Sequence, residues 1–226
     1  MKKVRLIIFA KAPLAGISKT RLIPTLGEKG AAKLAKQLLL YTVNNALLSS
    51  VDSVELCVFP NPESEDWQQD DVFEQINAAS KKARKHLVWS AQSDGDLGAR
   101  LLHAAKQSTE NDEYVLLIGT DCPSLTPKVL QQAKDELMAY NAVINPATDG
   151  GYVLLGLQSV DACLFENMPW STSSVCTESL KRMQSLQWNV SLLSVLHDID
   201  ESEDLQWLPE SWPDRNSYCP KPLVGE

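Results

Sequence analysis

Short apolar runs alternate with longer amphipathic stretches along almost the whole chain. The apolar runs are rich in β-branched and aromatic residues, and most end near Gly, Pro or Asn, a pattern typical of buried strands. The amphipathic stretches favour helices that bury one face. Strands are predicted at residues 4–10, 54–59, 86–89, 114–119, 142–145, 152–157 and 190–195. Helices are predicted at residues 30–48, 63–85, 99–108, 127–140, 173–187 and 201–208.

This alternation predicts an α/β fold with a mostly parallel sheet and helices on both of its faces. The length of 226 residues suits one large domain better than two small ones. We expect residues 1–208 to form this domain. Residues 209–226 hold Trp212 and several prolines, and we expect them to be an irregular tail that wraps around the domain or is mobile. In such sheets, ligands bind at the carboxyl ends of the strands.

Composition and charge argue against nucleic acid, a membrane and a zinc ion as partners of the chain. The net charge of −8 argues against a nucleic-acid-binding surface, which needs a basic footprint. No apolar stretch approaches the ~18 residues of a membrane span, and Lys11 interrupts the first apolar run, which indicates a strand rather than a signal peptide. The five cysteines are scattered without a CxxC pair, so neither a zinc site nor a disulfide framework is expected. A reducing cytoplasm is the simplest location.

A basic loop follows the first predicted strand. It contains Lys11, Lys19 and Arg21, together with Gly16, which allows backbone N–H groups to approach a phosphate. The loop is not a Walker motif, because GxxxxGK[ST] is absent. On charge alone, a solvated basic loop explains these residues equally well. We expect residues 12–18 to be mobile without a ligand, because little apolar surface anchors them.

Asp121 directly follows the strand predicted at 114–119, in the segment GTDCP. A carboxylate at the end of a buried strand suits Mg²⁺ or Mn²⁺, which bind one or two protein carboxylates together with substrate phosphates. The alternative is that Asp121 caps the next helix, although Ser124 and Thr126 are better placed to do so.

Asp198 and Asp200 follow the last predicted strand. They alternate along the chain, so in extended backbone they share a face and one or both are candidates to complete a metal site with Asp121. The alternative for Asp200 is the start of the next helix, with Glu203 three residues further on. The spacing of the histidines predicts no Ser/His/Asp or Cys/His catalytic arrangement.

Two glycine-containing segments have both structural and functional interpretations. The Asp-Gly-Gly sequence before the strand at 152–157 is either a tight turn or a backbone that an acceptor or sugar approaches closely. The segment GDLGAR is expected to border a base or ribose, with an arginine that meets phosphate or faces solvent. The candidate ligand contacts in these segments are Gly95, Asp96, Gly98, Arg100, Asp149, Gly150 and Gly151.

Six motifs occur in one order along residues 4–208. They are KAPLAGISKTRL (11–22), GDLGAR (95–100), GTDCPSL (119–125), PATDGGYVLLG (146–156), WST (170–172) and DIDESEDL (198–205). Together they resemble a bacterial family of uncharacterised glycosyltransferase-like proteins that is similar to phospholactate guanylyltransferase. The chain departs from the family pattern at Ala15, where a proline usually precedes the loop glycine.

The resemblance implies a Rossmann-like glycosyltransferase A fold, the fold of nucleotide-diphospho-sugar transferases. By resemblance, Lys11, Lys19 and Arg21 bind phosphate, and Asp121 binds Mg²⁺ or Mn²⁺ with Asp198 or Asp200. Catalytic roles are expected for Lys19, Arg21 and Asp121.

The implied activity is transfer from a nucleotide-sugar or a nucleoside triphosphate to a small-molecule acceptor, and the resemblance leaves open whether glycosyl or nucleotidyl groups move. A nucleotide-binding regulator that has lost catalysis is the alternative. The intact basic loop and Asp121 speak against it.

Overall fold

The structure is a computed structural model that describes residues 2–212 and 214–218. Its strands lie close to the predicted positions, and the last is shorter than predicted. Their bounds are Lys3–Lys11 (β1), Ser53–Phe59 (β2), Leu87–Ala91 (β3), Glu113–Ile118 (β4), Ala142–Pro146 (β5), Tyr152–Leu157 (β6) and Val190–Leu192 (β7). All of them belong to one sheet. The mixed α/β architecture with a mostly parallel sheet is confirmed.

The strand order is β3-β2-β1-β4-β6-β5-β7, and β6 alone runs antiparallel to its neighbours in the described sheet. The register pairs Leu6 of β1 with Val54 of β2 and with Leu116 of β4. Because β6 is reversed, its first residues lie at the edge where β1 and β4 end. The start of β6 is therefore brought to the edge at which parallel sheets bind ligands.

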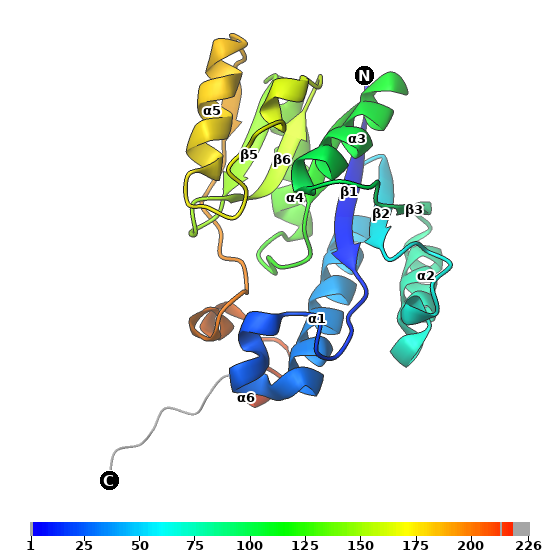
Figure 1. Ribbon diagram of the computed structural model, residues 1–226. Helices are drawn as coiled ribbons and strands as arrows, with labels where there is room; N and C mark the ends of the chain where they lie inside the picture. The colour runs from blue at the N-terminus through cyan, green and yellow to red at the C-terminus, as the bar shows by residue number, and fades with distance from the viewer. Residues whose placement is uncertain (1, 213, 219–226) are drawn as a thin grey trace.

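The helices cover both faces of the sheet (Figure 1). Their bounds are Ile23–Leu48 (α1), Val72–Ala83 (α2), Leu97–Glu110 (α3), Pro127–Leu137 (α4), Val175–Ser185 (α5) and Arg215–Tyr218 (α6). Residues of α1, α2 and α4 pack in one apolar core with Leu6 and Ile8, while residues of α3 and α5 pack in another with Ile7. Successive β1 side chains thus enter opposite cores, as the alternation of a strand requires.

Helix α1 begins at Ile23, earlier than the predicted start at Gly30. Pro24 occupies the first turn, where its missing N–H costs no hydrogen bond. The backbone departs from helical geometry at Gly27, with φ 70° and ψ 165°, and then resumes. This break explains why the apolar periodicity becomes regular only from Gly30 onward.

Short 3-10 turns occur at five places in the described residues: Thr20–Leu22 (η1), Glu65–Trp67 (η2), Gln69–Asp71 (η3), Ala162–Leu164 (η4) and Ser202–Trp207 (η5). Three of them, η2, η3 and η5, lie where a helix was predicted. The predicted helix 63–85 is divided into η2, η3 and α2, and the predicted helix 201–208 is η5. Glu201 and Asp204 form a capping box at the start of η5, so the helix-start pattern near Asp200 is real.

The described part of the tail packs on α1 rather than apart from the domain. The Trp212 ring meets Tyr41 edge-on at 5.3 Å, and Asp214 lies 2.9 Å from the Lys33 ammonium. Tyr218 is buried in a third apolar cluster with residues of α1 and η5. Figure 1 shows the red segment against the blue part of α1. Packing therefore continues past the predicted boundary at residue 208, and residues 213 and 219–226 lie outside the described part.

Candidate active site

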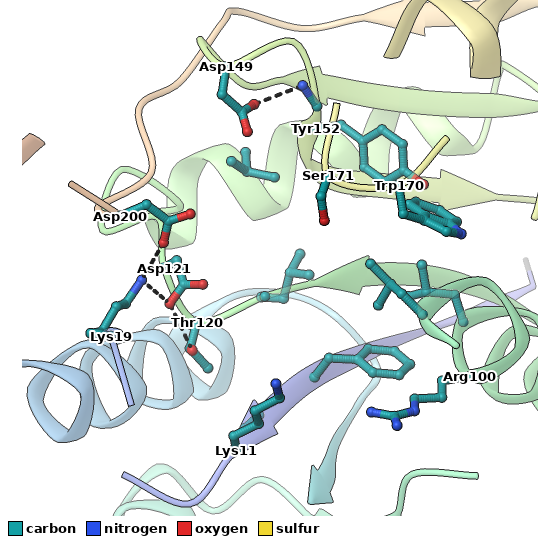
Figure 2. A pocket seen from close by; sticks show the side chains of 18 of the residues that line it. Lys11, Lys19, Arg100, Thr120, Asp121, Asp149, Tyr152, Trp170, Ser171 and Asp200 are labelled. Atoms are coloured by element: carbon teal, nitrogen blue, oxygen red, sulfur yellow. Dashed lines mark hydrogen bonds and ion pairs between the residues drawn. The ribbon is translucent and has the colours of Figure 1, made fainter. Parts of the chain in front are cut away.

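A cavity of about 720 Å³ opens at the carboxyl ends of β1 and β4. Its walls come from the basic loop, the first turns of α3, the start of β6 and the segment 170–175. Figure 2 shows Asp121 and Asp200 on one side, with Lys11 and Arg100 below and Asp149 above. The cavity brings together parts of all six sequence motifs, although they are far apart in the chain.

Lys19 joins the two aspartates that were predicted to share a metal site. Its Nζ lies 2.7 Å from Asp121 Oδ1, 2.8 Å from Asp200 Oδ1 and 2.6 Å from the Ile199 carbonyl oxygen. The three hydrogens of the ammonium group therefore each have an acceptor. The Lys19 side chain is only 8% exposed, whereas Asp121 and Asp200 are 45% and 41% exposed. In this arrangement Lys19 serves as an internal counter-ion and has no hydrogen left for a phosphate.

The charged state of Lys19 follows from these contacts. Burial by itself would lower the pKa of Lys19, but the attraction of Asp121 and Asp200 outweighs burial and raises this pKa. The backbone at Lys19 is left-handed, with φ 50° and ψ 47°, a conformation that costs free energy in a residue with a Cβ. The contacts of the ammonium group help to hold this conformation.

Asp198 is half-buried and does not line the cavity. Burial, followed by the nearby carboxylate of Asp149, raises the pKa of Asp198 to about 6. Asp200 and Asp121 contribute to the same shift. Between the two aspartates of DID, Ile199 is fully buried and donates its N–H to the Asp121 carbonyl oxygen at 2.9 Å. Of the two aspartates, Asp200 is the one that lines the cavity and meets the Lys19 ammonium group, and Asp198 does not share its position.

The donor set at Asp121 and Asp200 fits a divalent cation. Two carboxylate oxygens and the Ile199 carbonyl oxygen converge on one positive atom, and oxygen ligands are those that Mg²⁺ and Mn²⁺ prefer. Within the described residues, no group of three or more His, Cys, Asp or Glu side chains has the geometry of a metal site. These residues therefore suit a cation that takes its remaining ligands from substrate and water.

The basic loop is anchored more firmly than expected. Ala12 is buried, and its N–H donates to the Phe59 carbonyl oxygen at 3.0 Å. The Ser18 hydroxyl accepts from the Leu14 N–H at 2.9 Å and donates to the Ala12 carbonyl oxygen at 3.1 Å. The premise that little apolar surface holds residues 12–18 is therefore wrong for Ala12 and Leu14, which pack on the main core.

The other predicted phosphate contacts of this loop differ in their positions. Lys11 and Arg21 line the cavity, and the Arg21 side chain is 66% exposed, with Glu201 3.6 Å away. Gly16 has φ 78° and lies outside the cavity lining, facing the Glu28 carboxylate. The backbone N–H groups at Lys19, Thr20 and Arg21 begin a helical segment, so no partner exists for them within that helix.

The segment GDLGAR shapes the start of α3. Asp96 caps the helix by accepting from the Ala99 N–H at 2.8 Å, and a Cβ on Gly98 would lie 2.5 Å from the Phe165 carbonyl oxygen. Gly95, with φ 105°, makes the turn before this cap. Of the four predicted contacts here, Arg100 lines the cavity, while Gly95, Asp96 and Gly98 have structural tasks instead.

The Asp-Gly-Gly segment is divided between the cavity and the protein interior. Gly150 has φ 92°, and a Cβ there would lie 2.1 Å from the Ser173 carbonyl oxygen, so the chain itself occupies the space expected for a ligand. Asp149 and Gly151 line the cavity. One Asp149 carboxylate oxygen accepts from the Gly151 N–H at 2.8 Å, which fixes the side chain at the cavity edge.

Several residues that line the cavity were not predicted from the sequence. Gln92 donates from its amide nitrogen to the carbonyl oxygens of Ala10 and Cys57, both at 3.1 Å, so its amide oxygen is directed to Arg100. The other missed residues are Thr120, Tyr152, Trp170, Ser171 and Thr172. The WST motif was the available signal for the last three, but it carries no charged or titratable group to suggest chemistry.

Solved structures of transferases share this fold. A protein from Desulfovibrio desulfuricans that is assigned as a nucleotide-diphospho-sugar transferase aligns at a TM-score of 0.79 and 27% identity, over 97% of this chain and 93% of that protein. The 4-diphosphocytidyl-2C-methyl-D-erythritol synthase of Anaerococcus prevotii aligns at 0.53 and 14% identity, over 91% and 96% of the two chains. The inositol-1-phosphate CTP transferase of T. maritima aligns at 0.52 and 13%, over 100% and 99%.

The fold, with its cavity at the strand ends, defines a transferase of the nucleotide-diphospho-sugar transferase superfamily. The chain belongs to the family described as "Uncharacterized protein conserved in bacteria (DUF2064)", whose model matches residues 42–172. No curated protein sequence matches the chain. In the part of the chain that the structure describes, no helix combines the length and apolar character needed to cross a membrane.

Proposed function

We propose that the chain is a metal-dependent transferase that binds the phosphates of a nucleotide donor at the end of β1. The observation that carries this proposal is the convergence of Asp121 and Asp200 on one positive charge at the cavity edge. A cation-binding pair beside a cavity with exposed basic side chains suits a reaction in which a phosphate-containing group leaves.

The phosphates of the donor meet positive groups from two elements. Lys11 and Arg21 line the cavity from the loop after β1, and Arg100 lines it from α3. In a chain of net charge −8, this local concentration of cations supports an anionic ligand.

Asp121 and Asp200 would hold the cation, and Lys19 would release them when it binds. A Lys19 ammonium group released from these carboxylates would have hydrogens available to the donor phosphates, the role expected from the sequence. When bound, the cation offsets the negative charge that develops on the leaving phosphate oxygens. The other residues of the site would orient the donor against the acceptor and hold the donor phosphates by contacts with the basic side chains.

We place glycosyl transfer first among the possible reactions. In that reaction an acceptor oxygen bonds to the sugar carbon, the bond from that carbon to the phosphate oxygen breaks, and a nucleoside diphosphate leaves. The similarity to the D. desulfuricans protein, at 27% identity over nearly all of both chains, supports this choice. Nucleotidyl transfer is the second candidate, favoured by the cations around the cavity. In that reaction an acceptor phosphate oxygen bonds to the α-phosphorus of a nucleoside triphosphate, the bond from that phosphorus to the bridging oxygen breaks, and pyrophosphate leaves.

The test is a calorimetric titration of nucleoside diphosphates and triphosphates, with and without Mg²⁺, into the parent and the Asp121→Asn variant. The parent should bind at least one nucleotide more tightly with Mg²⁺, and Asp121→Asn should lose this Mg²⁺ dependence. Glu74→Gln removes an exposed carboxylate on α2 and should behave like the parent. The absence of nucleotide binding, or an Asp121→Asn variant that keeps the full Mg²⁺ effect, would contradict the proposal.

A further inference from the structure

The cavity has two unlike sides. Lys11 and Arg100 lie on one side in Figure 2, and Asp149, Tyr152, Trp170 and Ser171 lie on the other, which we call the aromatic wall. The aromatic wall comes from the start of β6 and the WST motif. The basic side carries positive charge, whereas the aromatic wall carries rings, a hydroxyl group and one carboxylate. The two sides therefore suit different chemical groups of a ligand.

The two aromatic residues turn their polar atoms away from the cavity. The Tyr152 hydroxyl and the Trp170 indole nitrogen are both buried, and the Tyr152 hydroxyl interacts with Ser179 of α5. A Cβ on Gly98 would lie 2.8 Å from this indole nitrogen, so the nitrogen is directed at α3. The surface that these rings give to the cavity is therefore carbon, which suits the C–H face of a ring-shaped ligand.

Ser171 is a polar residue of the aromatic wall and is held in a turn by its neighbour Thr172. The Ser171 side chain is exposed and has no hydrogen bond in the described part of the chain. Its backbone has φ 62°, which is unfavourable for serine. Thr172 holds the turn, because its hydroxyl donates to the Pro169 carbonyl oxygen at 2.7 Å and lies 2.8 Å from the Ser174 hydroxyl. The turn thus keeps Ser171 in a strained conformation at the cavity.

The charge of the aromatic wall opposes an anion. Asp149 is its charged residue, and no Lys, Arg or His from β6 or residues 170–175 lines the cavity. A phosphate or carboxylate placed here would be repelled, whereas hydroxyl groups can donate to Asp149 and exchange hydrogen bonds with Ser171.

We propose that the aromatic wall binds an uncharged, hydroxyl-bearing ring, such as the sugar of a nucleotide-sugar, while the basic side binds the phosphates. This inference rests on the proposed function and makes it more specific. Trp170 and Tyr152 supply the ring contact, and Asp149 and Ser171 determine specificity by accepting and donating hydrogen bonds. Charged sugar acids and acceptors with a second phosphate are the ligands that this wall discriminates against.

The test compares each nucleoside diphosphate with its sugar-linked form. UDP and UDP-glucose, GDP and GDP-mannose, ADP and ADP-glucose, and CDP and CDP-glucose are titrated with Mg²⁺ into the parent, Ser171→Ala and Asp149→Asn. For the base that the protein prefers, the parent should bind the sugar-linked form about tenfold more tightly. Both variants should lose most of this gain while their affinity for the plain diphosphate stays unchanged. Ser159→Ala, an exposed serine outside the cavity, is the matched control and should keep the gain.

A second comparison tests the charge of the wall. The parent should bind UDP-glucuronate or GDP-mannuronate more weakly than the neutral counterpart, and Asp149→Asn should narrow this difference. If the diphosphates bind but the sugar adds no affinity in the parent, the inference is overturned and the proposed function stands. The inference is also overturned if both variants keep the full gain. If no nucleotide binds at all, both proposals fail, and melting curves of each variant exclude loss of folding as the cause.

Discussion

Lys19 is the residue on which the electrostatics of the site depends. Its buried ammonium group links two partly exposed carboxylates from segments far apart in the sequence. The sequence predicts that Lys19, Asp121 and Asp200 belong to one site, because each follows a buried strand. It does not predict that they contact one another, since this contact depends on how a left-handed residue at position 19 directs its side chain.

Replacing Lys19 by Met tests its role as a counter-ion. Without added metal, Lys19→Met should lower the free energy of unfolding by ~1–3 kcal/mol, less than for a fully buried pair because the carboxylates are partly exposed. Mg²⁺ should raise the melting temperature of the variant more than that of the parent, because the cation no longer competes with the ammonium. Lys33→Met breaks an exposed ion pair with Asp214 and is the control. Equal Mg²⁺ responses in Lys19→Met and the parent would refute the competition.

Arg21 offers the complementary case of an exposed cation. Its side chain contacts only Glu201 among the described ion pairs, at 3.6 Å. Arg21→Ala should weaken nucleotide binding by ~1.5–3 kcal/mol, the range for a hydrogen bond to a charged group. The melting temperature should barely change, because little of the side chain is buried. Titration and melting of the same samples separate the two effects, and unchanged affinity would remove Arg21 from the site.

Among the elements around the cavity, the loop glycines have functions that their sequence motifs do not determine. A glycine in a loop indicates that a side chain is not tolerated, but it does not show whether a ligand or the chain itself approaches. The backbone of Phe165 packs against Gly98, and the backbone of Ser173 packs against Gly150, so neither glycine has room for a side chain. Gly151, in contrast, lines the cavity. The strands were predictable from their apolar runs. The first turn of α1 was not, because the break at Gly27 interrupts the apolar periodicity of the helix.

Gly150 permits a test of this packing between elements. Gly150→Ala would place a Cβ 2.1 Å from the Ser173 carbonyl oxygen at a φ of 92°, so the turn and the segment before α5 must separate. We expect a loss of at least ~2 kcal/mol in the free energy of unfolding, combining backbone strain and lost contacts. Gly119→Ala is the control, because its Cβ would meet nothing within 4 Å. Equal denaturant midpoints for the two variants would show that the close approach at Gly150 is wrong.

At the scale of the whole molecule, the C-terminal segment closes one end of the domain. Trp212 packs on Tyr41, and Tyr218 is buried with apolar residues of α1 and η5, including Leu205. The η5 segment directly follows Asp200, so this packing supports the position of a site residue. The sequence could not place the tail, because its irregular composition lacks a helical or strand period.

Truncation shows how much the described tail contributes. A chain that ends at Pro209 should lose ~2–4 kcal/mol of unfolding free energy, because the burial of two aromatic side chains is removed. A chain that ends at Tyr218 keeps these contacts and serves as the control. The shorter chain should also bind nucleotide with a weaker Mg²⁺ effect, since Asp200 loses support. Equal melting temperatures for the two truncations would contradict the packing role of Trp212 and Tyr218.

Product analysis is the most direct measurement of the proposed activity. The purified chain is incubated with Mg²⁺, nucleotide-sugars or nucleoside triphosphates, and a panel of sugar and sugar-phosphate acceptors, and the products are identified by mass spectrometry. We predict a Mg²⁺-dependent transfer that releases a nucleoside diphosphate and is lost in Asp121→Asn but retained in Glu74→Gln. Release of pyrophosphate instead would favour nucleotidyl transfer. A chain that binds nucleotide at this cavity, yet releases neither product with any acceptor, would contradict the proposed transferase activity and indicate a nucleotide-binding regulator.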